Sequence, residues 1–178
     1  MNRTTLLLAA LVLTGTSAAA IPDVSAQGRI RGHAVAHTGD GGRTAVTGAA
    51  ARGERGAFAR GRQVHGDGQG NVDGHSRAYA AGANGGTAQR EDSFYRHADG
   101  SAGRQGSASI NGPNGGSATT SGSIARDADG NVNGSRSTSA TGKNGNSYNG
   151  STNVQNGVIT HTGTCSNAAG ETIACRGN

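Results

Sequence analysis

Residues 112–130, GPNGGSATTSGSIARDADG, decide the fold, because two glycine-ending turns enclose a polar run of strand length. The first turn is Gly112-Pro113-Asn114-Gly115, and the second ends at Gly130. Proline favours the first central position of a type I turn, Asn or Asp suits the second, and glycine accepts the left-handed backbone that follows. Such a turn makes a three-residue hairpin loop. We therefore predict a β-hairpin at each of these two turns.

The same turn signal recurs along the chain at intervals of 12 to 15 residues. Gly82-Ala83-Asn84-Gly85 and Gly142-Lys143-Asn144-Gly145 match the first turn, and alternation with the Asp-containing turns suggests a 30-residue pair as the unit. Repetition at a fixed period is typical of repeat architectures. The sequence predicts an all-β fold, a repetitive antiparallel meander of β-hairpins. The predicted turn glycines are Gly41, Gly56, Gly70, Gly85, Gly100, Gly115, Gly130, Gly145, Gly157 and Gly170.

The composition leaves three forms of this fold open: an open sheet, a sheet closed into a roll or barrel, and a largely disordered chain. The protein has 33 Gly, two Phe and no Trp. A fully buried Val or Ile stabilises by about 1.5–3 kcal/mol, whereas each ordered residue loses about 1–2 kcal/mol of backbone entropy. A compact core is therefore marginal, and disorder is the alternative. Glycine at this frequency disfavours helices.

A three-residue loop has a consequence for the faces of the sheet. It pairs residue i with residue i+4, so that opposed residues share parity and even-numbered residues are predicted to share one face throughout. An apolar even face and a polar odd face would mark a half-buried sheet. The larger apolar residues after position 26 are mostly even (Ile30, Val46, Phe58, Val64, Val72, Phe94, Ile110, Ile124, Val132, Tyr148, Val154, Val158) and less often odd (Val35, Tyr79, Tyr95, Ile159, Ile173).

The N-terminus has the pattern of a secretory signal peptide. Arg3 precedes an apolar run over residues 6–13, and small residues lead to Ala26, with an alternative cleavage point after Ala20. This pattern predicts a removable segment at 1–26 and a secreted or periplasmic protein. The apolar run is shorter than the about 20 residues of a membrane span, so we expect no integral membrane insertion after cleavage.

The mature chain divides by composition into an Arg-rich segment, residues 27–66, and more regular hairpin repeats, residues 67–178. Only Asp40 and Glu54 oppose the arginines of the first segment. A basic patch of this kind favours anionic polymers such as lipopolysaccharide, extracellular DNA or acidic polysaccharide. The alternative is a solvated edge that guards against aggregation. The candidate anion-binding residues are Arg29, Arg31, Arg43, Arg52, Arg55, Arg60 and Arg62.

Cys165 and Cys175, the two cysteines of the chain, flank the final turn at Gly170 and share odd parity. The secretory route favours oxidation, so we predict a disulfide that staples a C-terminal hairpin. The six histidines are scattered singly, without the spacing of a metal site. No nucleophile elbow or phosphate-binding loop occurs in the sequence. We therefore expect no catalytic residue, no metal and no cofactor, and we predict that the protein is not an enzyme.

The Gly-x-Asn-Gly turns at 82, 112 and 142, together with the Cys165–Cys175 hairpin, resemble the uncharacterised Gly/Ser/Ala-rich secreted repeat proteins of Gram-negative bacteria. The resemblance implies an envelope or extracellular location and no known activity; curli-type amyloid subunits are a looser analogy. We expect a secreted, non-enzymatic structural or surface-interaction repeat protein, acting in matrix, envelope or self-assembly. The alternative is a binding module for anionic polymers that uses the Arg-rich segment.

Overall fold

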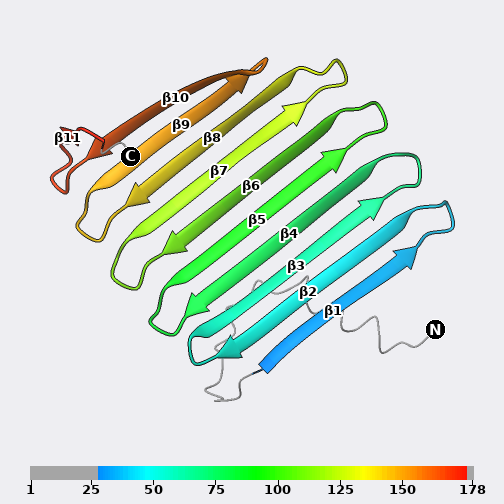
Figure 1. The fold of residues 1–178 in the computed structure, drawn as a ribbon, viewed down its shortest axis with the longest axis horizontal. Coiled ribbons are helices and arrows are strands. Elements are labelled where there is room, and N and C mark those ends of the chain that lie inside the picture. The colour runs from blue at the N-terminus through cyan, green and yellow to red at the C-terminus, as the bar shows by residue number, and fades with distance from the viewer. Residues whose placement is uncertain (1–27, 176–178) are drawn as a thin grey trace.

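The computed structural model describes residues 28–175, which form one open antiparallel sheet of eleven strands (Figure 1). The strand order in the sheet follows the chain order, as predicted for a meander. The sheet does not close, because β1 and the β10–β11 hairpin lie at opposite ends. The strands are β1 (Gly28–His37), β2 (Arg43–Gly53), β3 (Gly56–Gly66), β4 (Val72–Gly82), β5 (Thr87–Arg96), β6 (Ala102–Asn111), β7 (Ser117–Arg126), β8 (Val132–Thr141), β9 (Ser147–Gln155), β10 (Val158–Ser166) and β11 (Thr172–Ile173).

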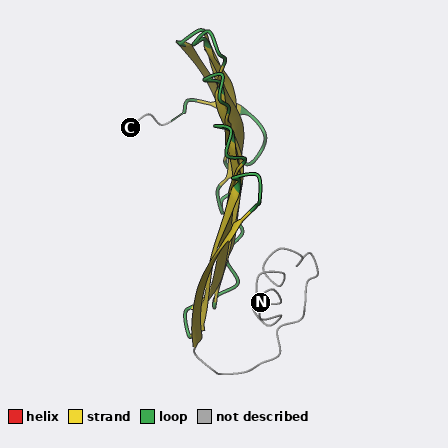
Figure 2. Cartoon of the chain, turned by 90° about the vertical axis from the view of Figure 1, so that its right-hand side faces the viewer, coloured by secondary structure: helices red, strands yellow, loops and turns green. Residues whose placement is uncertain are grey.

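The described strands make a single layer, seen edge-on in Figure 2. Within residues 28–175 no hydrophobic side chain is buried, and Ile30 and Ile159 are 70% and 69% exposed. Backbone ladders and cross-strand side-chain pairs therefore hold the sheet together in place of a core. The described residues contain no helix that is long and apolar enough to cross a membrane. The predicted signal peptide lies outside the described residues.

Eight turns have the three-residue loop that the sequence predicts, and in seven of them the turn glycine N–H also donates to the carbonyl three residues earlier. In the β6/β7 turn the Gly112 N–H donates to the Gly116 carbonyl at 2.6 Å, and the Gly115 N–H donates back to the Gly112 carbonyl at 3.3 Å. Gly115 has φ +91°, the left-handed conformation that a side chain disfavours. All ten glycines at the predicted turn positions have positive φ. Successive turns lie at opposite ends of the strands, so the 30-residue pair corresponds to two strands and the two turns that follow them.

Two turns are shorter than predicted, and they correct the parity prediction. Gly53 pairs directly with Gly56 across the β2/β3 turn, and Gln155 pairs with Val158 across the β9/β10 turn. Each two-residue loop opposes residues of unlike parity, so the even set changes face there. The prediction that even residues share one face throughout is therefore wrong for β1, β2, β10 and β11, and it holds from β3 to β9.

The register defines two faces of the sheet. The arginine face carries the odd residues of β1, β2, β10 and β11 and the even residues of β3–β9; the hydroxyl face carries the others. The larger apolar side chains remain unequally divided after the correction. On the arginine face lie Val35, Phe58, Val64, Val72, Phe94, Ile110, Ile124, Val132, Tyr148, Val154, Ile159 and Ile173; on the hydroxyl face lie Ile30, Val46, Tyr79, Tyr95 and Val158.

Glycines inside the strands make room for aromatic rings on the neighbouring strand. A Cβ on Gly74 would lie 2.5 Å from Cε1 of Phe94, which is directly opposite on β5. A Cβ on Gly103 would meet the ring of Tyr95 in the same way on the other face. These close approaches explain why a β-sheet tolerates glycine, a weak strand former, at these two positions.

The predicted disulfide is present and joins Cys165 to Cys175, with Cα atoms 5.3 Å apart. The two cysteines are not directly opposite, because Cys165 pairs with Ile173 and Cys175 lies two residues farther on. The bridge is thus a diagonal link across the β10/β11 hairpin. A disulfide is compatible with an oxidising periplasmic or extracellular location.

Candidate functional site

The arginine face is the candidate site, because strand register gathers charges there that are far apart in the sequence. Ten of its side chains are arginines, whereas Asp92 is the one carboxylate among its described strand residues. The arginines come from seven strands, β1–β3 and β5–β8. They are Arg29, Arg31, Arg43, Arg60, Arg62, Arg90, Arg96, Arg104, Arg126 and Arg136.

The structure places the seven predicted anion-binding arginines in three different settings. Five of them, Arg29, Arg31, Arg43, Arg60 and Arg62, lie on the arginine face. Arg52 lies on the hydroxyl face of β2, and Arg55 lies in the two-residue β2/β3 turn.

The other five arginines of the arginine face could not be found from local composition. Arg90, Arg96, Arg104, Arg126 and Arg136 are spread over the regular repeats, where no local excess of basic residues draws attention to them. Their shared even parity was the available signal, because β3–β9 follow the predicted three-residue-loop register.

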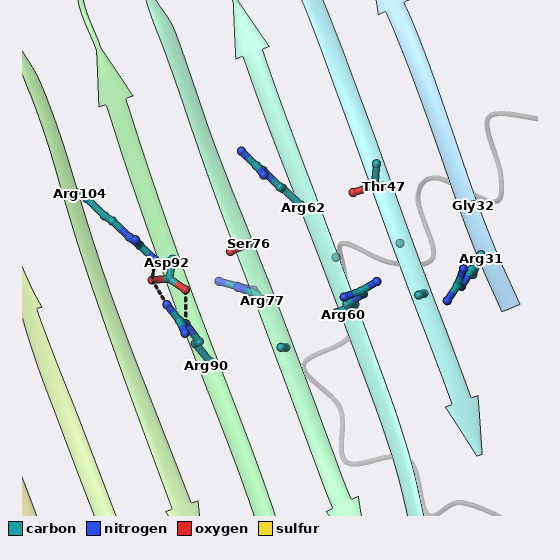
Figure 3. A pocket seen from close by; sticks show the side chains of 14 residues that line it. Arg31, Gly32, Thr47, Arg60, Arg62, Ser76, Arg77, Arg90, Asp92 and Arg104 are labelled. Carbon is teal, nitrogen blue, oxygen red and sulfur yellow. Dashed lines mark hydrogen bonds and ion pairs between the residues drawn. The ribbon is translucent and has the colours of Figure 1, made fainter. Parts of the chain in front are cut away.

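Asp92 neutralises part of the arginine face. Its carboxylate accepts from the Arg90 Nε at 2.5 Å and from an Arg104 terminal nitrogen at 2.8 Å (Figure 3). The hydrogen bond from Arg90, reinforced by Arg104, holds the pKa of Asp92 below its ordinary value. Asp92 in turn raises the pKa of Arg90. This three-residue cluster fixes two guanidinium groups in place.

Other arginines on this face use neutral partners. The Arg62 guanidinium lies 5.6 Å from the centre of the Phe94 ring, Arg126 donates to the Gly100 carbonyl at 3.0 Å, and Arg136 donates to the Thr120 hydroxyl at 3.0 Å. Between residues 28 and 175, eight arginines of this face form no ion pair: these three and Arg29, Arg31, Arg43, Arg60 and Arg96. Their charge is therefore available to a ligand.

Three of the arginines form a straight row across the strands. Arg31 pairs with Ala49, Ala49 with Arg60, Arg60 with Ala78, and Ala78 with Arg90. Arginine thus occurs on every second strand of this row, at intervals of about 9.6 Å. The small alanines between them leave a shallow depression that these arginines line, and Figure 3 shows it from above.

The described carboxylates lie mainly at the ends of the strands. Asp40, Asp67, Asp99 and Asp127 occupy turns on one side of the sheet, where hydrogen bonds from their own turns lower the pKa of each. For Asp127 the main donor is the Asn131 side chain at 2.9 Å, followed by the Asn131 N–H. These charges stay ionised at the rim and do not cover the arginine face.

The hydroxyl face has a different chemistry over β6–β10. Four neighbouring positions on each of these strands are Ser, Thr, Asn or Gln, without a charged residue among them. We call this set the polar array: Gln105, Ser107, Ser109, Asn111, Ser117, Thr119, Ser121, Ser123, Ser135, Ser137, Ser139, Thr141, Ser147, Asn149, Ser151, Asn153, Thr160, Thr162, Thr164 and Ser166.

The remaining chemical groups are dispersed. Within residues 28–175 no group of three His, Cys, Asp or Glu side chains could hold a metal ion. His161 contacts Tyr148 and Thr152, and His65 contacts Thr44. The strongest chemical feature of the described residues is therefore the concentration of guanidinium groups. The chain matches no known family model, and no curated protein and no solved structure is similar to it.

Proposed function

We propose that the protein is a secreted, non-enzymatic surface-interaction protein whose arginine face binds anionic polymers. The observation that carries this proposal is the segregation of charge. Among the described strand residues, ten arginines share one face with a single aspartate, and the turn aspartates lie at the ends of the strands. Guanidinium groups match carboxylate, sulfate and phosphate oxygens and shed little hydration on binding. A long flat face suits a linear ligand, whereas an enclosed pocket would suit a small molecule.

The row of Arg31, Arg60 and Arg90 suggests how a polymer lies on the sheet. Binding across the strands places one cation under the ligand at every second strand. Arg62, opposite Thr47 in the adjacent row, broadens this track. Recognition of this kind depends on charge and spacing, so we expect similar binding to acidic polysaccharides and to DNA of any sequence, with steep salt dependence.

The test compares two triple variants that change net charge equally. Replacing Arg31, Arg60 and Arg62 by Ser removes three charges from the arginine face. Replacing Arg52, Arg55 and Arg77 by Ser removes three from the hydroxyl face and a turn. The first variant should elute from heparin at much lower salt than the wild-type protein, and its plot of log affinity for DNA against log salt should be shallower by about one unit for each phosphate-contacting arginine removed.

The control variant should remain close to the wild-type protein in both measurements. Equal loss in the two variants would show that binding follows net charge alone and would overturn the assignment to the arginine face. Absence of heparin and DNA binding by the wild-type protein at low salt would overturn the proposed function itself.

A further inference from the structure

Both long edges of the described sheet have unpaired backbone groups. β1 pairs with β2 along all ten of its residues and, among residues 28–175, has no partner on its other side. β10 pairs with β9 along nine residues, but β11 covers only Cys165 and Ser166. Residues 158–164 therefore present an open edge at the other end of the sheet (Figure 1). Unpaired strand edges are templates for pairing with another chain.

The turns reveal which residues direct their backbone groups outward. The Thr38 N–H donates across the β1/β2 turn to Gly42, so by alternation the even residues of β1 bond to β2 and its odd residues point to the open edge. The Asn167 N–H donates to Glu171, which lies on the β11 side of β10. By alternation, the backbone groups of Ile159, His161 and Gly163 also point to that side, away from β9, where the edge is open. On both edges the outward-pointing residues belong to the arginine face.

Strand direction matches the two edges to each other. Each strand from β1 to β10 is antiparallel to the next, so β10 runs antiparallel to β1. A second copy that is only translated along the sheet therefore presents its β1 to β10 in the antiparallel sense. Its arginine face also lies on the same side, and the two sheets form one continuous sheet.

Charge favours this pairing over the pairing of two β1 edges. β1 carries Arg29 and Arg31, so pairing of two β1 edges brings four guanidinium groups together. β10, Val158–Ser166, has no Asp, Glu, Lys or Arg and no Pro, the residues that usually protect an edge strand. A copy's β1 therefore meets no like charge on β10. Placing Ile159 opposite Val35 extends the apolar row that already joins Ile159 to Val154.

We infer that copies of this protein associate head to tail, with β10 of one copy pairing with β1 of the next. In the Ile159–Val35 register, residues 159, 161 and 163 form hydrogen-bonded pairs with residues 35, 33 and 31. The new ladder stops before Cys165 and Ser166, which β11 already covers, so Gly28 and Arg29 lie outside it. This interface joins two different surfaces and does not close, so it generates an open ribbon. The arginine face becomes a longer cationic track, although the association itself does not depend on polymer binding.

The experiment uses two proline variants, each of which blocks one edge. Proline is tolerated on an edge strand where its missing N–H faces outward. Val35→Pro disables β1 as a partner and leaves β10 competent; His161→Pro does the reverse. The proteins are purified in oxidised form after secretion by an expressing host, and their association is followed by sedimentation velocity across a wide concentration range. Circular dichroism checks that each variant keeps its β spectrum.

The wild-type protein should form a concentration-dependent series of oligomers, and each proline variant alone should stay monomeric. An equal mixture of the two variants should form dimers and nothing larger, because one competent edge of each kind remains. Val35→Thr and His161→Thr keep the N–H groups and should assemble like the wild-type protein. The monomeric variants should still bind heparin, which separates this inference from the proposed function.

Three results would overturn head-to-tail pairing. A wild-type protein that is monomeric at every concentration shows that the edges do not associate. Dimers of His161→Pro alone indicate pairing of two β1 edges, and dimers of Val35→Pro alone indicate pairing of two β10 edges. If either proline variant loses its β spectrum, oxidised wild-type protein is instead titrated with a β1 peptide covering residues 28–37, whose failure to block oligomer growth counts against the inference.

Discussion

The two faces of this sheet share one backbone and differ in almost everything else. The arginine face has most of the larger apolar side chains and ten arginines, whereas the hydroxyl face has the polar array and five larger apolar residues. Because the described residues form one layer with no buried hydrophobic side chain, neither face is a core. The comparison teaches that turns and ladders are enough to set the architecture here. It also predicts that cross-strand contacts on the arginine face add more stability than those on the hydroxyl face.

The largest expected difference between the faces comes from two glycines. A side chain at Gly74, on the arginine face, would collide with Phe94 and with the Gln63 carbonyl, whereas a Cβ on Gly32, on the hydroxyl face of β1, meets nothing within 4 Å. Gly74→Val should lower the free energy of unfolding by about 2–3 kcal/mol, the usual effect of overpacking. Gly32→Val should leave it unchanged or raise it by up to about 1 kcal/mol, since valine is the better strand former.

Urea unfolding of the two glycine variants, followed by circular dichroism, measures this difference. Equal and small effects would mean that Phe94 moves aside freely, and the packing described for the arginine face would then contribute little to stability.

A smaller difference is expected from two adjacent aromatic residues on β5. Phe94 is half-buried against Gly74 on the arginine face and under the Arg62 guanidinium, while Tyr95 is 38% exposed on the hydroxyl face and stacks on His97. Phe94→Ala should reduce the free energy of unfolding by about 2 kcal/mol, from lost apolar contact and the lost cation–π interaction. Tyr95→Ala should reduce it by about 1 kcal/mol. Chemical denaturation of both variants checks the order, and a larger loss for Tyr95→Ala would reverse the ranking of the faces.

The repeat architecture could be predicted from the sequence because the turn chemistry is local. Pro113, Asn114 and Gly115 specify a type I turn and a left-handed residue without reference to any distant contact. The local sequence also marks the two-residue turns, β2/β3 and β9/β10, as different from the others. Arg55 is the residue before Gly56, whereas Asn, Asp, Gln or Ala precedes each of the other turn glycines. Asn156-Gly157 follows the shortest interval in the series. Asn156 has φ +49°, consistent with a two-residue Asn-Gly turn.

The candidate site was less accessible to sequence reasoning, because face membership depends on every turn that precedes a residue. One residue more or fewer in a loop moves a whole strand's side chains to the other face. Arg52 and Arg60 look equivalent in the sequence, yet they lie on opposite faces once the strand register is known. The open edges could not be predicted from the sequence either, because the predicted meander could be an open sheet or a closed one.

A substitution at Asp92, the aspartate of the arginine face, should change heparin binding and the free energy of unfolding in opposite directions. The pKa of Asp92 is depressed in the folded protein, so its contribution to stability is present above the ordinary Asp pKa of about 3.9 and is lost as the pH falls through the folded value. Asp92→Asn should therefore be less stable than the wild-type protein at pH 7. Because Arg90 and Arg104 are each 58% exposed and screened by solvent, we expect a difference of only about 0.5–1 kcal/mol.

Thermal unfolding at neutral and strongly acidic pH measures this effect. The difference between Asp92→Asn and the wild-type protein should disappear in acid, where Asp92 is protonated in both folded and unfolded chains. The variant should bind heparin more tightly at neutral pH, because two guanidinium groups lose their carboxylate. Weaker heparin binding would mean that Asp92 holds Arg90 and Arg104 in the orientation that the polymer needs.

The smallest effect is expected within the polar array. Ser121 and Ser137 are directly opposite on β7 and β8, and their hydroxyl oxygens are 3.1 Å apart. Both side chains are exposed, so water replaces this contact readily and the double change to Ala should alter the free energy of unfolding by less than about 0.5 kcal/mol. Equilibrium denaturation of the single and double variants isolates the coupling between the two hydroxyls. A coupling energy well above that value would make the polar array a stabilising hydrogen-bond network. A negligible coupling energy leaves hydration as the main physical effect of the array. Its uncharged hydroxyl and amide groups then keep the hydroxyl face of the single-layer sheet hydrated, while the arginine face carries most of the apolar contacts.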